Sequence, residues 1–274
     1  MGKERRSLSG EFQVKWVLPL LSGDKSMVQL LEWMMKGEAG KADSDGPALQ
    51  QVRANYDRLS GWWDLFSLPE RRYVHAGLRM LGAKPGERVL EIGFGTGNAL
   101  LSLAQSVGPG GRAYGLDISP RMYAVAWSKL ERRHLQSEVT LHLCSASTLP
   151  FPDSALDAVF SSFTLELFSD SDLLTVLREC ARVLRNGGRI CAVAMSARNR
   201  NRLAPRLYRW AHGRYPNIVD CRPILVARAL GQTGLTVERA EEMVSYGLPV
   251  DVVLATKGLS KNYLLFWDAG SCPR

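Results

Sequence analysis

Apolar and polar positions follow two patterns in turn between about residue 70 and residue 257. Short apolar runs with a period of two predict strands, and apolar positions spaced by three or four predict helices. The predicted strands are 88–92, 113–117, 139–144, 155–162, 189–195, 236–245 and 248–257. The predicted helices are 70–81, 98–106, 119–134, 170–184 and 226–234. Strands that alternate with helices indicate an α/β domain, and the last two strands are expected to form an antiparallel hairpin.

A glycine-rich loop joins the first predicted strand to its helix. Gly93, Gly95 and Gly97 stand at alternate positions, and the acid Glu91 comes just before them. Glycine permits a positive φ in such a turn, and its missing side chain lets a ligand lie against the backbone. A second acid, Asp117, ends the next strand, where a carboxylate can accept hydrogen bonds from ribose hydroxyls. The spacing differs from the Gly-x-Gly-x-x-Gly of dinucleotide enzymes, so we expect a nucleoside-containing ligand without a pyrophosphate.

These motifs resemble a known family. The segment 89–97 is similar to the first motif of class I S-adenosylmethionine-dependent methyltransferases. The segments 149–160 and 184–190 are similar to the ubiquinone/menaquinone C-methyltransferase-like branch, and the resemblance covers about residues 48–257. It implies a doubly wound, Rossmann-like methyltransferase sheet that is mostly parallel with an antiparallel last strand. Helices flank that sheet, and a helical N-terminal extension and a lid accompany it.

The resemblance also implies a cofactor, S-adenosylmethionine, whose product is S-adenosylhomocysteine. The family usually has Gly-Asp-Ala after the third strand, whereas this chain has Cys144-Ser145-Ala146, so a hydroxyl replaces the carboxylate at the adenine edge. Met122 matches a position that packs against the nucleoside, although ordinary packing of helix on sheet would also explain it. The residues expected at the cofactor are Glu91, Gly93, Gly95, Thr96, Gly97, Asn98, Asp117, Ile118, Met122, Ser145, Ala146 and Phe163.

Candidate catalytic residues are fewer. Glu166 follows the fourth predicted strand, whose C-terminal end faces the methyl sulfur in this fold, so it is the first candidate for a general base. An acid at a helix N-terminus, stabilised by the helix dipole, is the alternative explanation. His75 and His212 are weaker candidates, and many enzymes of this type need no dedicated base.

Two regions are candidates for contact with the acceptor. Tyr56 and Trp62 lie in an aromatic helical stretch before the first motif, and Tyr208 and His212 lie in an arginine-rich segment, 197–223, which the resemblance assigns to a substrate lid. An aromatic stripe at helical spacing is also typical of a core. The predicted domains are an N-terminal extension and linker (1–47), the methyltransferase domain (48–257) and a C-terminal tail (258–274).

Composition limits the setting. The chain has 274 residues, a net charge of +8 and a pI near 9.4. Its five cysteines include no C-x-x-C pair, so we expect no metal site, no disulfide framework and a reducing, cytoplasmic compartment. No apolar run is long enough to span a membrane. Peripheral contact with a membrane and a homodimer stay open, and a nucleic-acid partner is not expected.

The sequence therefore predicts an S-adenosylmethionine-dependent methyltransferase that acts on a small molecule, such as a quinol, a phenol, a lipid-like compound or a secondary metabolite. One alternative is a methyltransferase for RNA or protein, which the basic charge favours mildly. Another is a cofactor-binding regulatory protein without catalysis, which is compatible with Ser145 standing where the family usually has an aspartate. A dinucleotide oxidoreductase is disfavoured by the glycine spacing.

Overall fold

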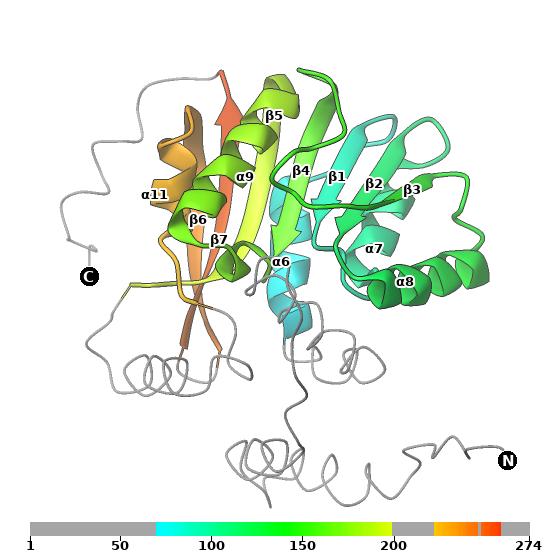
Figure 1. The fold of residues 1–274 in the computed structure, drawn as a ribbon, viewed down its shortest axis with the longest axis horizontal. Coiled ribbons are helices and arrows are strands. Elements are labelled where there is room, and N and C mark those ends of the chain that lie inside the picture. The colour runs from blue at the N-terminus through cyan, green and yellow to red at the C-terminus, as the bar shows by residue number, and fades with distance from the viewer. Residues whose placement is uncertain (1–69, 199–221, 246–247, 259–274) are drawn as a thin grey trace, which may run out of the picture. The chain divides into compact units, whose positions relative to one another are not determined.

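The computed structural model describes residues 70–198, 222–245 and 248–258 (Figure 1). Helices and strands follow one another along this part of the chain. The elements are α6 (Arg71–Leu81), β1 (Arg88–Ile92), α7 (Asn98–Val107), β2 (Arg112–Asp117), α8 (Pro120–Arg133), β3 (Val139–Leu143), β4 (Leu156–Ser162), the 3-10 helix η3 (Leu165–Leu167), α9 (Asp170–Val183), β5 (Leu184–Met195), α11 (Val226–Gly231), β6 (Leu235–Ser245) and β7 (Leu248–Lys257). This order matches the predicted alternation.

The seven described strands form one sheet in the order β3-β2-β1-β4-β5-β7-β6. The first five strands pair in parallel, while β7 lies antiparallel to both β5 and β6. The predicted mostly parallel sheet and the antiparallel hairpin at its end are therefore confirmed. The chain order reverses between β1 and β4, and the carboxyl ends of strands at such a switch point are where ligands bind in doubly wound sheets.

Helices cover both faces of the sheet and enclose two cores. Apolar side chains of α6, α7 and α8 pack on one face, and those of α9 and α11 pack on the other. Figure 1 views the sheet from the α9 face, with α6 behind β4. The central strands β1, β4 and β5 are buried along most of their length, as expected for parallel strands joined by helical crossovers.

One strand boundary differs from the prediction by more than one residue. The expected start of β5 was residue 189, but the strand begins at Leu184, directly after α9. Leu184 pairs with Leu156 of β4, and regular pairing resumes at Arg189 with Ala158 after a register shift. The Asn-Gly-Gly run at 186–188 is therefore an irregularity inside the strand rather than a turn before it.

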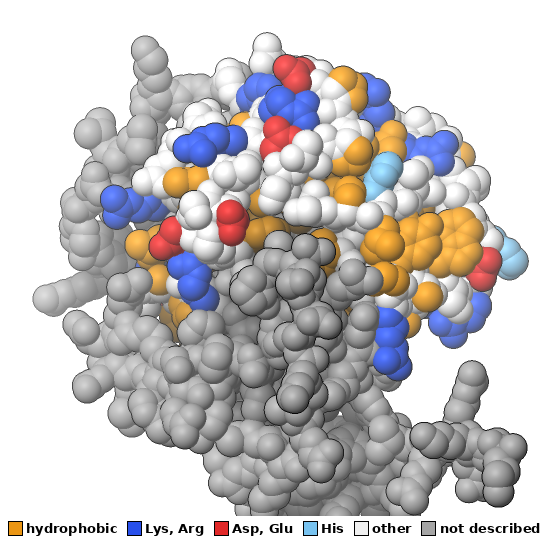
Figure 2. Space-filling model, in the orientation of Figure 1, with side chains coloured by type: hydrophobic (Ala, Val, Ile, Leu, Met, Phe, Trp, Pro, Cys, Tyr) orange, Lys and Arg blue, Asp and Glu red, His pale blue; other side chains and the backbone are white. Residues whose placement is uncertain are grey.

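The basic composition does not produce one charged field on the visible face. Figure 2 shows Lys and Arg side chains interspersed with Asp and Glu on the described part of that face. Several charges of the described residues are paired, for example Arg222 with Asp170 at 2.8 Å. Within the described ranges, none of the helices has the length and apolar character needed to cross a bilayer. The predicted extension 1–47 and nearly all of the predicted tail 258–274 lie outside the described residues.

Candidate active site

A cavity of about 510 Å³ lies at the carboxyl ends of β1, β2 and β4 and extends to α6. Its volume falls within the range of about 300–1,000 Å³ that is usual for small-molecule sites. The lining includes Glu91, the residues from Ile92 to Thr96, Asn98, the residues from Leu116 to Ser119, Ser145, Ala146 and the residues from Ser162 to Thr164. The cavity therefore opens at the point where the strand order reverses, as the topology predicts.

The glycine loop forms one wall of the cavity. Gly93 has φ +71°, and a Cβ atom added there would stand 2.1 Å from Thr164 Oγ1, so this glycine allows the loop to pack against the end of β4. Gly95 has φ +50°, and an added Cβ would meet no atom within 4 Å. Gly95 therefore presents bare backbone to the cavity, and this open cradle accommodates a ligand that lies against the main chain.

Asp117 fixes the geometry of this wall. Its Oδ2 accepts a hydrogen bond from the Gly95 N–H at 2.9 Å, and its Oδ1 accepts one from the Ser119 N–H at 2.9 Å. Two backbone loops are thus tied to one carboxylate. A carboxylate has about four acceptor positions, so these two N–H groups alone do not exhaust the capacity of Asp117 for hydrogen bonds.

Glu91 is a buried acid that faces the same cavity. Its exposed fraction is 2%, and its Oε2 has no hydrogen-bond partner among the described residues. Burial raises the pKa of Glu91 well above its usual value, and the nearby Asp117 carboxylate raises this pKa further. Buried polar atoms are normally hydrogen-bonded. An orphaned oxygen on the cavity wall is therefore suited to receive a donor from a bound ligand.

The loop after β3 closes another side of the cavity. Ala146 is buried, and Ser145 lines the cavity beside it. The Ser145 hydroxyl accepts a hydrogen bond from the Ser147 N–H at 3.3 Å and lies 3.2 Å from the Ser147 hydroxyl. It therefore stabilises its own turn, in addition to whatever contact it makes with a ligand.

An apolar wall of the cavity is built around Phe163. Phe163 has φ +49°, an uncommon conformation for a residue with a large side chain. Its N–H donates to the Val193 carbonyl at 2.8 Å, and its ring meets the Tyr73 ring edge to face at 6.3 Å. Backbone strain of this kind is often found at functional sites. The other apolar residues on this wall are Val74, Leu78, Leu167 and Phe168.

Most of the residues predicted at the cofactor come together at this cavity, but two do not. Gly97 and Met122 are not part of the lining. Gly97 precedes α7, and a Cβ there would stand 2.9 Å from Ala126 Cβ, so this glycine lets α7 approach α8. Met122 is fully buried in the core between α8 and the sheet. Packing of helix on sheet, the alternative explanation, accounts for its position.

Glu166 also lies away from the cavity lining. It falls in η3, which turns its side chain into the protein, and its exposed fraction is 1%. Its Oε1 accepts a hydrogen bond from the Met195 N–H at 2.8 Å, at the end of β5. This geometry gives Glu166 a structural contact and does not support the prediction that it acts as a general base on an acceptor in the cavity.

His75 does line the cavity, from the exposed face of α6. Tyr56, Trp62, Tyr208 and His212 lie outside the described residues, as does most of the predicted lid 197–223.

Apart from His75, the residues that α6 contributes to the cavity were not predicted from the sequence. Arg71, Val74 and Leu78 line the cavity together with it. These residues are spaced by three or four, which places them on one side of a helix. This periodicity would have identified the lining face of α6 once His75 had been selected.

Comparison with known proteins finds similar sequences and structures. The family described as "Methyltransferase domain" matches residues 89–188. The chain is 34% identical over 150 residues to the demethylmenaquinone methyltransferase of Geobacillus sp. (strain WCH70), covering 54% of this chain and 61% of that one. It is 32% identical over 186 residues to the demethylmenaquinone methyltransferase of Tropheryma whipplei (strain Twist), covering 65% of this chain and 74% of that one.

A solved structure, of a SAM-dependent methyltransferase from Aquifex aeolicus, matches with a TM-score of 0.51 and 24% identity, covering 78% of this chain and 98% of that chain. This likeness shows the fold. The chain spans about three-fifths of the length of the first curated relatives that it matches.

Proposed function

Because the chain belongs to the family of S-adenosylmethionine-dependent ubiquinone and menaquinone C-methyltransferases, we propose that it transfers a methyl group from this cofactor to a small molecule of the quinol or phenol type. The relatives that carry the names demethylmenaquinone methyltransferase and ubiquinone/menaquinone biosynthesis C-methyltransferase support this acceptor class. No finding favours RNA, a protein or a non-catalytic role over it.

The residues of the cavity fit the cofactor. Asp117 would accept from the ribose hydroxyls, and the orphaned Oε2 of Glu91 would accept from the cofactor's donor groups. Bare backbone at Gly95 leaves room for close approach. When bound, S-adenosylmethionine supplies a methyl group on a positively charged sulfur, which is already activated for transfer. The protein's part is to orient both reactants and to exclude water.

The acceptor would occupy the half of the cavity near α6 and Phe163. Phe163, Leu167 and Phe168 offer an apolar surface that suits a flat aromatic ring. A quinol or phenol loses a proton in the course of methylation, and a side chain positioned beside the acceptor can accept that proton. We assign this role to His75, whose side chain lines the cavity, in place of Glu166.

The observation that carries this proposal is the carboxylate of Asp117, held by Gly95 N–H and Ser119 N–H beside a bare-backbone cradle. The full chain is incubated with S-adenosylmethionine carrying a deuterated methyl group and with reduced demethylmenaquinone, and products are followed by mass spectrometry. We expect S-adenosylhomocysteine and a deuteromethylated quinol. The substitution His75→Gln should slow turnover by about a hundredfold or more, with little change in the KM for the cofactor.

His134 serves as the control, because it is exposed at the end of α8 and lies outside the cavity lining. Its φ of +55° suits asparagine, so His134→Asn should leave turnover unchanged. Binding of the cofactor without any methylated product, across quinols and phenols, would contradict the proposed acceptor class.

The setting of the reaction is part of the same proposal. We propose the reducing cytoplasm, supported by the free thiols of Cys144, Cys180 and Cys191. A homodimer and peripheral contact with a membrane stay predictions that no observation tests.

A further inference from the structure

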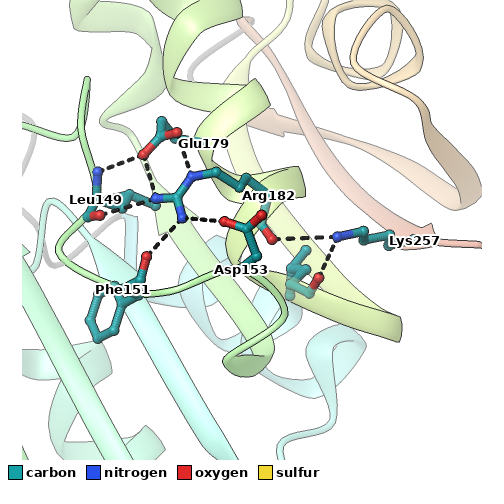
Figure 3. A network of polar contacts seen from close by, with 7 residues as sticks. Leu149, Phe151, Asp153, Glu179, Arg182 and Lys257 are labelled. Atoms are coloured by element: carbon teal, nitrogen blue, oxygen red, sulfur yellow. Dashed lines mark hydrogen bonds and ion pairs between the residues drawn. The ribbon is translucent and has the colours of Figure 1, made fainter.

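Arg182, near the end of α9, uses its whole guanidinium group to hold the loop before β4 (Figure 3). Nε and Nη2 each donate at 2.7 Å to the Glu179 carboxylate, Nη1 donates at 2.8 Å to the Phe151 carbonyl and to Asp153 Oδ1, and Nη2 donates at 3.1 Å to the Leu149 carbonyl. Five hydrogen bonds satisfy the five N–H donors of an arginine. One side chain thus bridges a helix to several points of the loop.

Glu179 completes this bridge. Its Oε2 accepts a hydrogen bond from the Leu149 N–H at 2.8 Å, so the same loop residue is held through both its N–H and its carbonyl. The hydrogen bond from Arg182 is the main cause that lowers the pKa of Glu179, which keeps its carboxylate ionised. A bidentate pair of this kind fixes direction as well as distance.

The loop depends on these side chains because its own sequence limits other hydrogen bonds. Pro150 and Pro152 have no N–H and cannot donate to a neighbouring strand. The end of α9 that carries Arg182 is itself fixed, since Lys257 Nζ donates to the Leu184 carbonyl at 2.7 Å and Ser154 N–H donates to the Arg182 carbonyl at 3.0 Å. The clamp is therefore rigid at its helical side.

The clamped loop leads directly to the cavity. Ser145 and Ala146 line the cavity, and only two residues separate Ala146 from Leu149. Leu149 is buried in the core on the α9 face, so its backbone cannot shift without moving this short connection. The position of the cavity wall at 145–146 is thus set, through Leu149, by side chains on α9.

We propose that Arg182, together with Glu179, is a positioning residue for the cofactor: it fixes the 145–153 segment, whose first two residues form the nucleoside side of the cavity. This inference rests on the proposed function, since it concerns the same cofactor. Arg182 does not line the cavity, and it acts through the loop that it holds.

A second arginine provides a matched control. Arg189 donates to the Glu87 carboxylate at 2.8 and 2.9 Å, to the Leu81 carbonyl at 2.6 Å and to the Gly82 carbonyl at 2.8 Å. It therefore combines a bidentate acid with backbone carbonyls, as Arg182 does. Glu87 precedes β1, at the amino ends of the parallel strands, whereas the cavity lies at their carboxyl ends. None of these four residues lines the cavity.

The experiment compares Arg182→Gln with Arg189→Gln in the full chain. Urea unfolding gives the stability of each, and calorimetric titration gives the Kd for S-adenosylhomocysteine and for 5′-methylthioadenosine, which lacks the amino-acid part. Both variants should lose stability. Only Arg182→Gln should weaken the binding of both ligands, raising each Kd by about tenfold or more, because a small displacement of a binding wall is costly. Its turnover at saturating cofactor should stay within about twofold of the parent, so that KM rises and kcat does not fall.

Arg182→Lys should give an intermediate Kd, because lysine keeps the charge but loses the planar fork. Equal changes in Kd for the two glutamine variants, or an unchanged Kd for Arg182→Gln, would overturn the positioning role. If Arg182→Gln does not fold, Glu179→Gln takes its place and should weaken both ligands by severalfold; an unchanged Kd would then reject the inference. If the parent chain binds neither ligand, the proposed function itself fails, which is a separate result.

Discussion

At the scale of single residues, Gly93 and Gly95 show how the same backbone requirement serves two purposes. Both have positive φ, but an added Cβ at Gly93 would collide with Thr164, whereas one at Gly95 would stand in open space. Gly93 thus permits packing between the loop and the end of β4. Gly95 leaves space at the cavity wall, and its own N–H donates a hydrogen bond to Asp117.

Alanine at each position should separate the two purposes. Gly93→Ala should lower the free energy of unfolding by about 2–4 kcal/mol, from φ strain and the collision together. Gly95→Ala should cost only about 1 kcal/mol of stability. It should weaken the binding of S-adenosylhomocysteine by about tenfold or more, since its Cβ enters the cradle. Urea unfolding and calorimetric titration measure both quantities. A Gly95→Ala protein that binds the ligand as tightly as the parent would show that the cradle is not the ligand site.

The buried acid Glu91 makes a prediction about pH. Its pKa in the folded state is raised by burial and by Asp117, so the folded protein binds this proton more tightly than the unfolded chain does. Folding stability therefore falls as pH rises from the ordinary carboxyl pKa to the raised one, by up to about 1.4 kcal/mol per pH unit. The substitution Glu91→Gln removes this titrating carboxyl.

Glu91→Gln should therefore stabilise the cofactor-free protein at pH 8 relative to the parent, and this advantage should shrink toward pH 4. Urea unfolding of both proteins across this range measures it. A pH-independent difference between the two proteins would show that the pKa of Glu91 is the same in the folded and the unfolded state, which would contradict this prediction.

The positions of some of these side chains were predictable from the sequence, and those of others were not, for a physical reason. Glu91 and Asp117 end neighbouring parallel strands, and such ends meet at one edge of a sheet, so their position at the cavity was predictable. Glu166 also follows a strand end, but a single turn of 3-10 helix decides which way its side chain points. That choice depends on the Met195 N–H at the end of β5, a contact that no local pattern reveals.

At the scale of elements, the start of α8 links helix stability to the candidate site. Ser119 accepts a hydrogen bond from the Met122 N–H at 3.1 Å as the N-cap, and its own N–H donates to Asp117. Ser169 caps α9 in the same way, through the Asp172 N–H at 3.2 Å, but it does not line the cavity. The two caps are thus alike in chemistry and different in location.

Ser119→Ala and Ser169→Ala should each lower the free energy of unfolding by about 1 kcal/mol, the usual cost of a lost cap. Only Ser119→Ala should also weaken S-adenosylhomocysteine, because the backbone that orients Asp117 is loosened. Thermal unfolding and calorimetric titration of both variants test this. If the two variants bind S-adenosylhomocysteine with equal affinity, the Ser119 cap does not contribute to the binding site.

The elements themselves were largely predictable. The N-terminus of α8 followed from Ser119 and Pro120, and the glycine spacing located the turn between β1 and α7. The start of β5 was misplaced because Asn186-Gly187-Gly188 has the composition of a turn. The pairing of Leu184 with Leu156 brings that run into the strand, which is a long-range effect.

At the scale of the whole molecule, the strand order explains why one cavity collects residues from distant parts of the chain. The reversal between β1 and β4 leaves a crevice at their carboxyl ends, and the glycine loop, Asp117 and Phe163 all lie there. The resemblance of the motifs implied this topology and this location. The pattern of residues could not identify the Arg182 clamp, because its partners come from a helix, a loop and a strand end.

The proposed function depends above all on the binding of S-adenosylmethionine in this cavity through Asp117. Calorimetric titration of the full chain with S-adenosylmethionine, S-adenosylhomocysteine and NADH, beside Asp117→Ala, tests it most directly. We expect the parent chain to bind the two sulfur compounds in the micromolar range, the variant to lose this binding, and NADH not to bind. If the parent chain binds neither sulfur compound, or if Asp117→Ala binds them as tightly as the parent, the proposal is contradicted.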